Sequence, residues 1–566
     1  MFKLCSFSAV ALLVALPAAS AGPDPSPYGI NGVVAIHART SPNAIAKAES
    51  DIRLMREAGI RWDRIELWWG VVEPEKGKWD FEFADRVVAL YKDSGVSPLA
   101  ILNYSSAWSG KPPADDEERQ AFARYAAKMI GRYKDTIRCW EVWNEPNIPT
   151  FWPTPNVKDY AELLKVTYKA AKEADPDCVI IAGSTSGPDY GFIRGIFDNG
   201  AWDSCDAISI HPYSMAGGPG SQRLGELLEM ANDCIASTGK DKPLWITEMG
   251  WTSSSPEEDA RQAAYLAQSY VIAAVQGVEK LFWFKLEDWS EKWGIVKPDG
   301  TKKPAYKAYQ TLTKSFASPV LVGPLQLAPE LEGYLFRTGG STVFVTWSRY
   351  GTPVSVALPV GPGSKVMDAV GAPVSLKDGR ATVSDMPVFV LEPGARARLE
   401  AARSRRRPIR PYPDGNHLLN AGFERGSGSD AWAWNQGVFD GHQKKGEFFA
   451  GAGRSGRAAG IRKATDAAWD SWPIPVRWGK DYRLAGWAKV NGSGGKVTAG
   501  IHWYNGNQWT WKRADVCDEI PADGLWHEFS VRGKAPEGVV LARIRLTAKD
   551  VDKEAVFDDL FFGPQN

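Results

Sequence analysis

Two acidic residues, Glu145 and Glu248, each end a run of apolar, strand-forming residues. Glu145 ends the segment WEVWNE, directly before a proline, and Glu248 ends the segment LWITE, before Met-Gly. Cleavage of a glycosidic bond requires one carboxylic acid that protonates the leaving oxygen and one carboxylate that acts as nucleophile or base. The two glutamates therefore predict glycoside hydrolysis. The alternative is that both are ordinary surface acids at strand ends.

The alternation of side chains along a strand predicts which neighbours accompany these acids. Residues two positions apart share a face of a strand, so Glu141 is expected beside Glu145. The same parity pairs further polar residues near the predicted site: Arg64 with Glu66, His211 with Tyr213, and Ile246 with Glu248. Carboxyl groups about 5 to 5.5 Å apart would retain the configuration of the sugar, and about 6.5 to 9.5 Å would invert it. The sequence alone does not fix that distance.

The elements that must position these residues alternate between short β-rich runs and longer amphipathic runs over residues 28–317. Eight strands are predicted, at 29–37, 62–69, 97–105, 137–144, 178–184, 206–213, 243–248 and 280–286. Helices are predicted between them, for example at 44–58, 117–133, 158–174 and 259–276. Eight such units are typical of a (β/α)8 TIM barrel of the α/β class, with its active site at the carboxyl ends of the strands. A doubly wound open sheet is the alternative.

Two β-rich regions follow the barrel, which is assigned to residues 22–317. Short alternating runs with Gly and Pro turns predict a small antiparallel β-domain at 318–400. The basic, proline-bearing stretch 403–411 favours a linker at 401–415, although it could instead contact an anionic glycan. Many short strands over 416–566 predict a C-terminal β-sandwich of the jelly-roll type.

The first 21 residues have the features of a secretory signal peptide. Lys3 precedes an apolar run at 9–16, and Ala19-Ser20-Ala21 supplies the small residues of a cleavage site. The mature chain is expected to begin near Gly22 and to be secreted or periplasmic. No other stretch has the ~18 consecutive apolar residues of a membrane span.

The composition points to a glycan ligand more than to a charged polymer. Lys plus Arg (67) equals Asp plus Glu (67), so no basic footprint favours nucleic acid or an anionic membrane as partner. The 25 Trp exceed ordinary usage, and their flat apolar faces suit the C–H surfaces of sugars, although many must fill the core. A polysaccharide or oligosaccharide is the expected substrate. The oligomeric state is not predicted.

The cysteines allow two interpretations. Loss of Cys5 with the signal peptide leaves five, an odd number without metal-ligand spacing. A disulfide between Cys205 and Cys234 is the preferred pairing, because both are expected near the same end of the barrel; five buried thiols are the alternative. No metal is expected at the barrel, and the proposed chemistry needs no cofactor.

Four motifs occur in an order that resembles the clan A retaining glycoside hydrolases. They are Trp143-Asn144-Glu145-Pro146-Asn147 at the fourth strand, His211-Pro212-Tyr213 at the sixth, Thr247-Glu248 at the seventh and Phe282-Trp283-Phe284 at the eighth. The resemblance covers the barrel and is greatest to glycoside hydrolase family 39, the family of β-xylosidases, α-iduronidases and bacterial exopolysaccharide endoglycosidases.

The resemblance implies roles for particular residues. Glu145 would be the acid/base, Glu248 the nucleophile, Asn144 a ligand of the sugar 2-hydroxyl, and Trp283 a stacking platform for the sugar. Tyr213 could hold an oxygen of the nucleophile.

Three further residues are predicted as substrate-binding, each with an open alternative. Arg64 could favour the anionic form of Glu248, or it could pair with Glu141 inside the barrel. His211 could reach the substrate or only support Tyr213. His37 is expected to line a further subsite.

The C-terminal region resembles jelly-roll carbohydrate-binding modules at 418–424, 482–487 and 556–560. The resemblance makes Glu424 and Asp558, or its neighbour Asp559, candidate ligands of a structural calcium ion; ordinary surface acids are the alternative. A sugar-binding face is expected from an excess of aromatic residues: Trp432, Trp434, Trp469, Trp472, Trp503, Tyr504, Trp509 and Trp511.

Together these features predict a secreted retaining hydrolase that cleaves β-linked O-glycosidic bonds in a polysaccharide, with an exopolysaccharide or a hemicellulose as the candidate classes. Two alternatives stay open. One is a non-catalytic glycan-binding or cell-envelope protein on a barrel scaffold, which the intact acid pair disfavours. The other is a transglycosylase that uses the same carboxylates.

Overall fold

A computed structural model describes residues 23–393 and 415–565, apart from short gaps at 33, 41, 110–111, 214–216, 221–222, 340, 350, 427–428, 432, 437–444, 493 and 506–509. The predicted signal peptide and almost all of the predicted linker lie outside these residues, as do Trp432 and Trp509. Within the described part of the chain, none of the helices combines the length and the apolar character that a membrane crossing requires.

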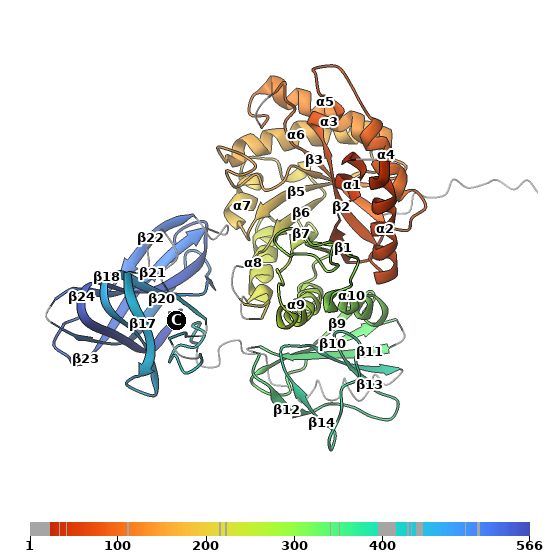
Figure 1. The fold of residues 1–566 in the computed structure, drawn as a ribbon. Helices are drawn as coiled ribbons and strands as arrows, with labels where there is room; N and C mark the ends of the chain where they lie inside the picture. The colour runs from red at the N-terminus through yellow and green to blue at the C-terminus, as the bar shows by residue number, and fades with distance from the viewer. Residues whose placement is uncertain are drawn as a thin grey trace, which may run out of the picture.

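Eight parallel strands close into a barrel, as predicted. Each strand pairs with the next, and β1 pairs with β8 to complete the circle. Figure 1 shows the barrel in red to green, with its helices outside the strands. The strands are β1 Tyr28–Asn31, β2 Trp62–Trp68, β3 Ser97–Asn103, β4 Cys139–Val142, β5 Val179–Ser186, β6 Ala207–His211, β7 Leu244–Met249 and β8 Lys280–Trp283.

The helices around the barrel begin where their capping residues predict. Asp115 caps α5 by accepting from the Glu118 backbone N–H, and Ser255 caps α9 in the same way, just before a proline in its first turn. The helices are α1 Val34–Thr40, α2 Pro42–Ala58, α3 Trp69–Val72, α4 Glu82–Tyr91, α5 Asp116–Tyr133, α6 Val157–Ala174, α7 Tyr190–Asp198, α8 Leu224–Ala236, α9 Pro256–Val275 and α10 Pro304–Ser315, with a short 3-10 turn η1 at Trp202–Ser204.

The first strand is shorter than predicted. It ends at Asn31, and the residues assigned to its second half form helix α1. The reason lies at Gly32, whose backbone N–H donates to Asp63 Oδ1 at 2.7 Å. A Cβ at Gly32 would lie 2.5 Å from that oxygen, so only glycine lets the chain turn here. The predicted strand at 29–37 is therefore wrong beyond Asn31.

The region after the barrel is an antiparallel β-structure. A five-stranded sheet has the order β13-β15-β11-β10-β9, and β12 pairs with β14. Leu335, Phe344 and Val390 are among the fully buried residues of its own small core. The strands are β9 Val320–Pro324, β10 Leu331–Thr338, β11 Ser341–Ser348, β12 Val354–Ala357, β13 Lys365–Asp368, β14 Arg380–Val383 and β15 Val388–Pro393.

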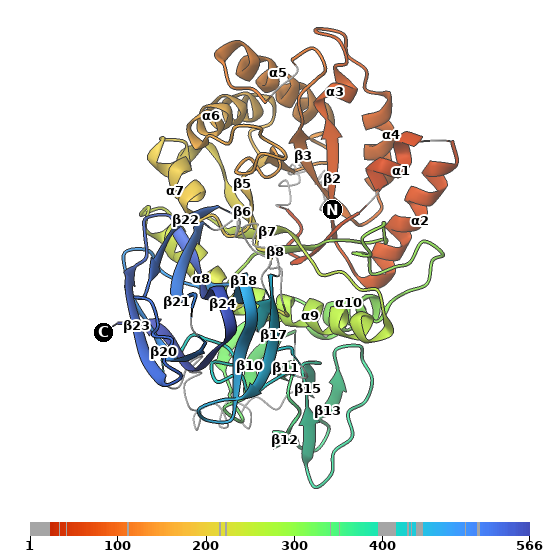
Figure 2. The same ribbon diagram turned by 60° about the vertical axis from the view of Figure 1, so that its left-hand side comes forward.

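The C-terminal unit is also antiparallel and β-rich, and Figure 2 shows it in blue against the side of the barrel that carries α8 and α9. Its residues Tyr504, Val540 and Leu541 join the apolar core of the barrel, and Arg477 forms ion pairs with Glu229 and Asp233 of α8. Its strands are β16 Trp434–Gln436, β17 Lys445–Ala452, β18 Arg457–Ser471, β19 Ile474–Pro475, β20 Asp481–Asn491, β21 Lys496–Asn505, β22 Trp511–Val516, β23 Trp526–Lys534 and β24 Val539–Pro564.

Candidate active site

The barrel interior is apolar at one end and polar at the other. A separate buried cluster near the amino ends of the strands contains Trp62, Trp245 and Phe282. Two residues farther along β2 and β4 come Arg64 and Glu141, both buried. Inward positions recur every second residue along a strand. The polar groups therefore form a layer next to the apolar cluster, on the side of the carboxyl ends of the strands.

Arg64 joins the buried polar layer to the barrel mouth. Its Nε lies 2.8 Å from Glu141 Oε2, and its Nη1 lies 2.8 Å from Glu248 Oε2. Arg64 therefore contacts both of the acids named in the two alternatives. Although burial opposes it, the Arg64 charge keeps the pKa of Glu141 below its usual value. The remaining nitrogen, Nη2, donates to Asn144 Oδ1 at 2.8 Å.

Glu248 is held by two donors on opposite sides of its carboxylate. Arg64 binds Oε2, and the Tyr213 hydroxyl donates to Oε1 at 2.7 Å. Burial and the neighbouring Glu248 charge keep the pKa of Tyr213 well above its usual value, so this hydroxyl retains its proton and acts as a donor. The predicted contact between Tyr213 and the nucleophile candidate is present.

Glu145 is oriented by His211. The histidine Nδ1 lies 2.9 Å from Glu145 Oε1, while its Nε2 lies 3.0 Å from Thr247 Oγ1 and 3.2 Å from Ser184 Oγ. His211 has no exposed surface, so in this structure it does not offer a face to a substrate. Of its two predicted roles only support is seen, and the side chain it supports is Glu145 instead of Tyr213.

Simple alternation fails at the strand ends that carry the acids. Strand β4 ends at Val142, and Trp143 has φ of 68°, so Asn144 and Glu145 both reach the site instead of lying on opposite faces. On β7 it is Thr247 that points inward to His211, and the pairing with β8 shifts between Ile246 and Met249. This irregularity lets Glu248 reach the mouth although it does not follow the parity predicted for it.

The two candidate acids lie close together. A carboxylate oxygen of Glu145, a carboxylate oxygen of Glu248 and a ring nitrogen of His211 are all within 4.8 Å of one another. Such a group could geometrically hold a metal ion, but Arg64 and Tyr213 already bind the Glu248 oxygens. The group fits a carboxylate pair better than a cation site.

Comparisons with known proteins agree with this geometry. Residues 43–292 match the model of the glycosyl hydrolases family 39. The solved structure of a family 39 glycoside hydrolase from Bacteroides cellulosilyticus WH2 shares 26% identity with a TM-score of 0.53, over 61% of this chain and 77% of that chain. The barrel of this chain is thus similar to that of the glycosyl hydrolases family 39.

Curated relatives match over shorter stretches. A β-xylosidase of Geobacillus stearothermophilus is 31% identical over 22% of this chain and 28% of its own length. A β-xylosidase of Caldicellulosiruptor saccharolyticus is 26% identical over 36% of this chain and 47% of its own length. The chain thus spans about a quarter to a half of the curated relatives it matches.

The aromatic residue at the end of β8 of the family 39-like barrel differs from the prediction. Trp283 has no exposed surface and packs on Trp251, with ring centroids 5.7 Å apart, so it has no free face for a sugar. Phe284 is the half-buried aromatic residue beside the site, 6.5 Å from the Tyr213 ring. The burial of Trp283 contradicts the stacking role predicted for it, and β8 ends at this residue instead of continuing to residue 286.

His37 lies in α1 and is tied to acids other than the catalytic candidates. Its Nδ1 is 2.6 Å from Asp51, and its Nε2 is 3.7 Å from Glu287. These three could also surround an ion, but the Lys47 ammonium already binds both carboxylates. The structure therefore does not bring His37 into the predicted substrate site.

The candidate calcium ligands of the C-terminal unit accept hydrogen bonds from the protein backbone. Asp558 accepts backbone N–H groups from Arg454, Ser455 and Asp559, and Glu424 accepts one from Arg457. Both acids thus bind the turn at residues 453–457, and the calcium site stays a prediction.

The structure also bears on the predictions made for the cysteines and for the aromatic residues of the C-terminal unit. Cys139, Cys178, Cys205, Cys234 and Cys517 are all free, so the preferred disulfide is wrong. The alternative of five buried thiols holds for all of them except Cys517, which is partly exposed. Of the C-terminal aromatic residues predicted to bind sugar, Trp434, Trp469, Trp503 and Tyr504 are buried. Trp511 is 50% exposed and Trp472 is partly exposed.

Sequence reasoning missed the residues that support the acids. Ser184, with φ of 47°, places its backbone oxygen 3.0 Å from the Glu145 N–H and its hydroxyl near His211. Thr247 binds His211 from the neighbouring strand. Polar residues in the apolar runs of β5 and β7 were the available signal, because a buried hydroxyl needs a partner.

Proposed function

We propose that this chain is a retaining glycoside hydrolase that acts on a β-linked polysaccharide. Glu145 serves as acid/base and Glu248 as nucleophile. The observation that carries the proposal is the approach of their carboxylate oxygens to within 4.8 Å, with a separate set of supporting groups around each acid. A close pair of this kind supports attack by the carboxylate itself, since inversion needs room for a water molecule between acid and sugar.

The supporting groups suit a division of labour between the acids. Arg64 and Tyr213 stabilise negative charge on Glu248 in its attack on the anomeric carbon and in its departure from the glycosyl-enzyme. Glu145 first donates a proton to the leaving oxygen and then takes one from the attacking water. Its contact with His211 fixes its orientation through both steps. Asn144, anchored by Arg64, is suited to bind the sugar hydroxyl next to the bond that breaks.

The substrate class rests on the relatives. Several of them are named as β-xylosidases or endo-1,4-β-xylanases, which favours a xylan-type hemicellulose over an exopolysaccharide. We also propose that residues 1–21 direct export, because a polymer of this kind is met outside the cell.

The test compares the wild-type chain with Glu248→Gln and Glu145→Gln on a panel of β-1,4-xylan, β-1,4-mannan and β-1,4-glucan. We expect Glu248→Gln to abolish release of reducing sugar and Glu145→Gln to lower the rate by about 10²- to 10⁴-fold, with the fold unchanged by circular dichroism. Product sizes separate hydrolysis from transfer to a second sugar. Activity that survives Glu248→Gln would sink the assignment.

A further inference from the structure

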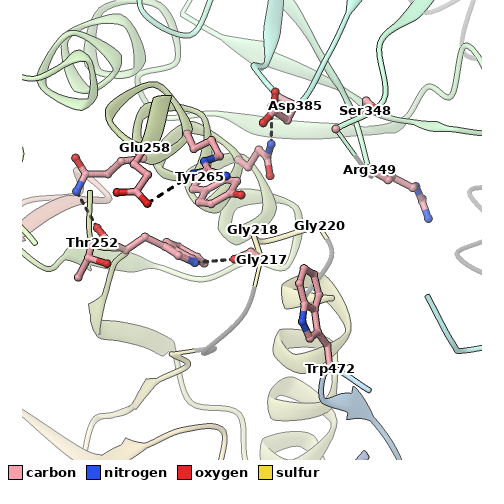
Figure 3. A pocket seen from close by; sticks show the side chains of 15 residues that line it. Gly217, Gly218, Gly220, Thr252, Glu258, Tyr265, Ser348, Arg349, Asp385 and Trp472 are labelled. Atoms are coloured by element: carbon pink, nitrogen blue, oxygen red, sulfur yellow. Dashed lines mark hydrogen bonds and ion pairs between the residues drawn. The ribbon is translucent and has the colours of Figure 1, made fainter. Parts of the chain in front are cut away.

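A second cavity lies away from the paired acids, at the meeting point of the three parts of the chain. Its volume is about 470 Å³. Trp251 and Tyr265 line it from the barrel, Ser348 and Arg349 from the small β-domain, and Trp472 from the C-terminal unit. Figure 3 shows the Trp472 ring rising toward Gly220, opposite the barrel residues.

The cavity adjoins the candidate active site through the segment after β7. Trp251 follows Glu248 by three residues and packs on Trp283 at the end of β8. Its Nε1 donates to the Gly217 backbone oxygen at 2.8 Å, which ties it to the loop after β6. Trp251 thus connects the wall of the cavity with the strand ends that carry Glu248 and Trp283.

Polar atoms around the cavity are buried without a hydrogen-bond partner among the described residues. They include Gln262 Oε1, Ser348 Oγ and Arg349 Nε on its wall. Glu332 Oε2 and Trp347 Nε1 are also buried without a hydrogen-bond partner among the described residues. Both lie close to Gly220 of the cavity wall, since a Cβ at Gly220 would be 3.7 Å from each of them. A buried polar atom without a partner is unfavourable, so such a cluster indicates a bound polar partner.

The chemistry of these atoms specifies the partner. Donors and acceptors are mixed, and the cations Arg261 and Arg349 on the wall are matched by the anions Glu258 and Asp385. Sugar hydroxyls both donate and accept, so they can satisfy such a mixture without a net charge. The rings of Trp472 and Tyr265 offer apolar surface for the C–H face of a sugar.

We propose that this cavity is a distal subsite that binds an uncharged sugar unit of the glycan whose bond is cleaved between Glu145 and Glu248. The proposal rests on the proposed function. It gives the C-terminal unit a defined task, because Trp472 completes the subsite. Long chains span both places, whereas a single sugar reaches only the acids.

The test measures kcat and KM of full-length variants on two kinds of substrate. The polymers are β-1,4-xylan, β-1,4-mannan and β-1,4-glucan, and the short substrates are the p-nitrophenyl β-glycosides of their sugars. We expect Trp472→Ala to raise KM for the cleaved polymer roughly three- to tenfold, as the loss of one aromatic contact would. The kinetics on the p-nitrophenyl glycoside should stay unchanged.

A matched control and a second variant protect the test from a folding defect. Trp478→Ala removes a tryptophan of the same C-terminal unit that is 36% exposed and does not line the cavity, and it should leave the kinetics on both substrates unaffected. Arg349→Met, on the opposite wall, should raise KM for the polymer as Trp472→Ala does. A raised KM for the polymer in both wall variants, with unchanged kinetics on the p-nitrophenyl glycoside, supports the subsite. A folding defect would instead lower activity on both substrates.

The outcomes separate the two proposals. The subsite is overturned if both wall variants match the wild type on the polymer, if they lower activity on both substrates equally, or if the wild type cleaves only the short glycosides. The proposed function itself fails if the wild type cleaves no substrate of either kind, or if Glu248→Gln matches it.

Discussion

At the scale of single residues, Arg64 serves two carboxylates with different surroundings. Glu141 is fully buried, and its partners are Arg64 and the Ser209 hydroxyl, which donates to it at 2.7 Å. The Glu248 side chain is 16% exposed at the barrel mouth. The guanidinium thus neutralises an interior charge and, with the same group, fixes a reacting one.

Removal of Arg64 should therefore affect stability through Glu141 and activity through Glu248. Arg64→Met leaves Glu141 as an uncompensated buried charge, and we expect a loss of about 3 to 5 kcal/mol in the free energy of unfolding. The double variant Arg64→Met/Glu141→Gln should recover most of that loss in urea unfolding while activity stays low. A double variant no more stable than the single one would contradict this account.

Lys285, which follows the site aromatic Phe284, gives a pH-dependent prediction. Burial lowers its pKa to about 7, against the opposing charge of Glu287 and other acids, and its Nζ has no hydrogen-bond partner within the described residues. The unfolded lysine keeps its proton to about pH 10.4. Between pH 7 and pH 10 the unfolded state thus binds more protons than the folded state, so stability from this group rises with pH and is lost as pH falls through 7.

Urea unfolding of the wild type and Lys285→Met at pH 6, 8 and 10 checks this. Above pH 7 we expect the free energy of unfolding of the wild type to rise, relative to that of the variant, by up to about 1.4 kcal/mol per pH unit. At pH 6 the variant should exceed the wild type in stability by the largest amount. Parallel pH profiles for the two proteins would show that Lys285 is not desolvated in the folded state.

The sequence predicted that the two acids and Tyr213 lie near one another at the barrel mouth, because each lies at or just beyond the carboxyl end of its strand. It failed where the backbone leaves regular strand geometry. Trp143 and Ser184 both have positive φ, and such local turns override the two-residue alternation on which the side-chain assignments depended.

At the scale of elements, an irregularity in β5 builds part of the site. The pairing of β5 with β6 shifts between Ala182 and Thr185. Gly183 within this bulge has φ of 101°, and a Cβ there would lie 2.6 Å from the Ser209 backbone oxygen. The bulge turns Ser184 toward Glu145 and His211, so glycine is required for the support of the acid.

Gly183→Ala should therefore destabilise the barrel by more than about 1 kcal/mol and reduce activity as well. Gly131→Ala is the matched control, since Gly131 lies in helix α5 with only ordinary contact to Ala174. The control should be neutral or stabilising by up to about 1 kcal/mol, with full activity. Equal effects of the two changes in thermal unfolding would rule out a special role for the bulge.

The eight strands were predictable because each is an apolar run of strand length between longer amphipathic segments. The ends of the strands were less predictable, and β1 is an example. The apolar residues Val34 and Ala35 fit either a strand or a helix packed on α2, and the close contact between Gly32 and Asp63 that decides between them joins distant parts of the sequence. Contacts of this kind are not encoded in local periodicity.

At the scale of the whole molecule, the barrel that contains the candidate catalytic centre is joined to two β-rich parts. The C-terminal unit packs on the barrel through apolar side chains and through the Arg477 ion pairs to α8. Its position next to the second cavity was not predictable, because it depends on surfaces far apart in the sequence. The paired acids and the proposed subsite at Trp472 together predict that a polymer is cleaved in preference to a single glycoside.

The central claim is that Glu145 and Glu248 cleave by double displacement, and the anomeric configuration of the first product tests it most directly. Proton NMR recorded in the first minutes of cleavage of a β-linked substrate distinguishes the two anomers before they interconvert. We predict that the β-anomer appears first, because two successive displacements retain configuration. Initial release of the α-anomer would show inversion and contradict the account.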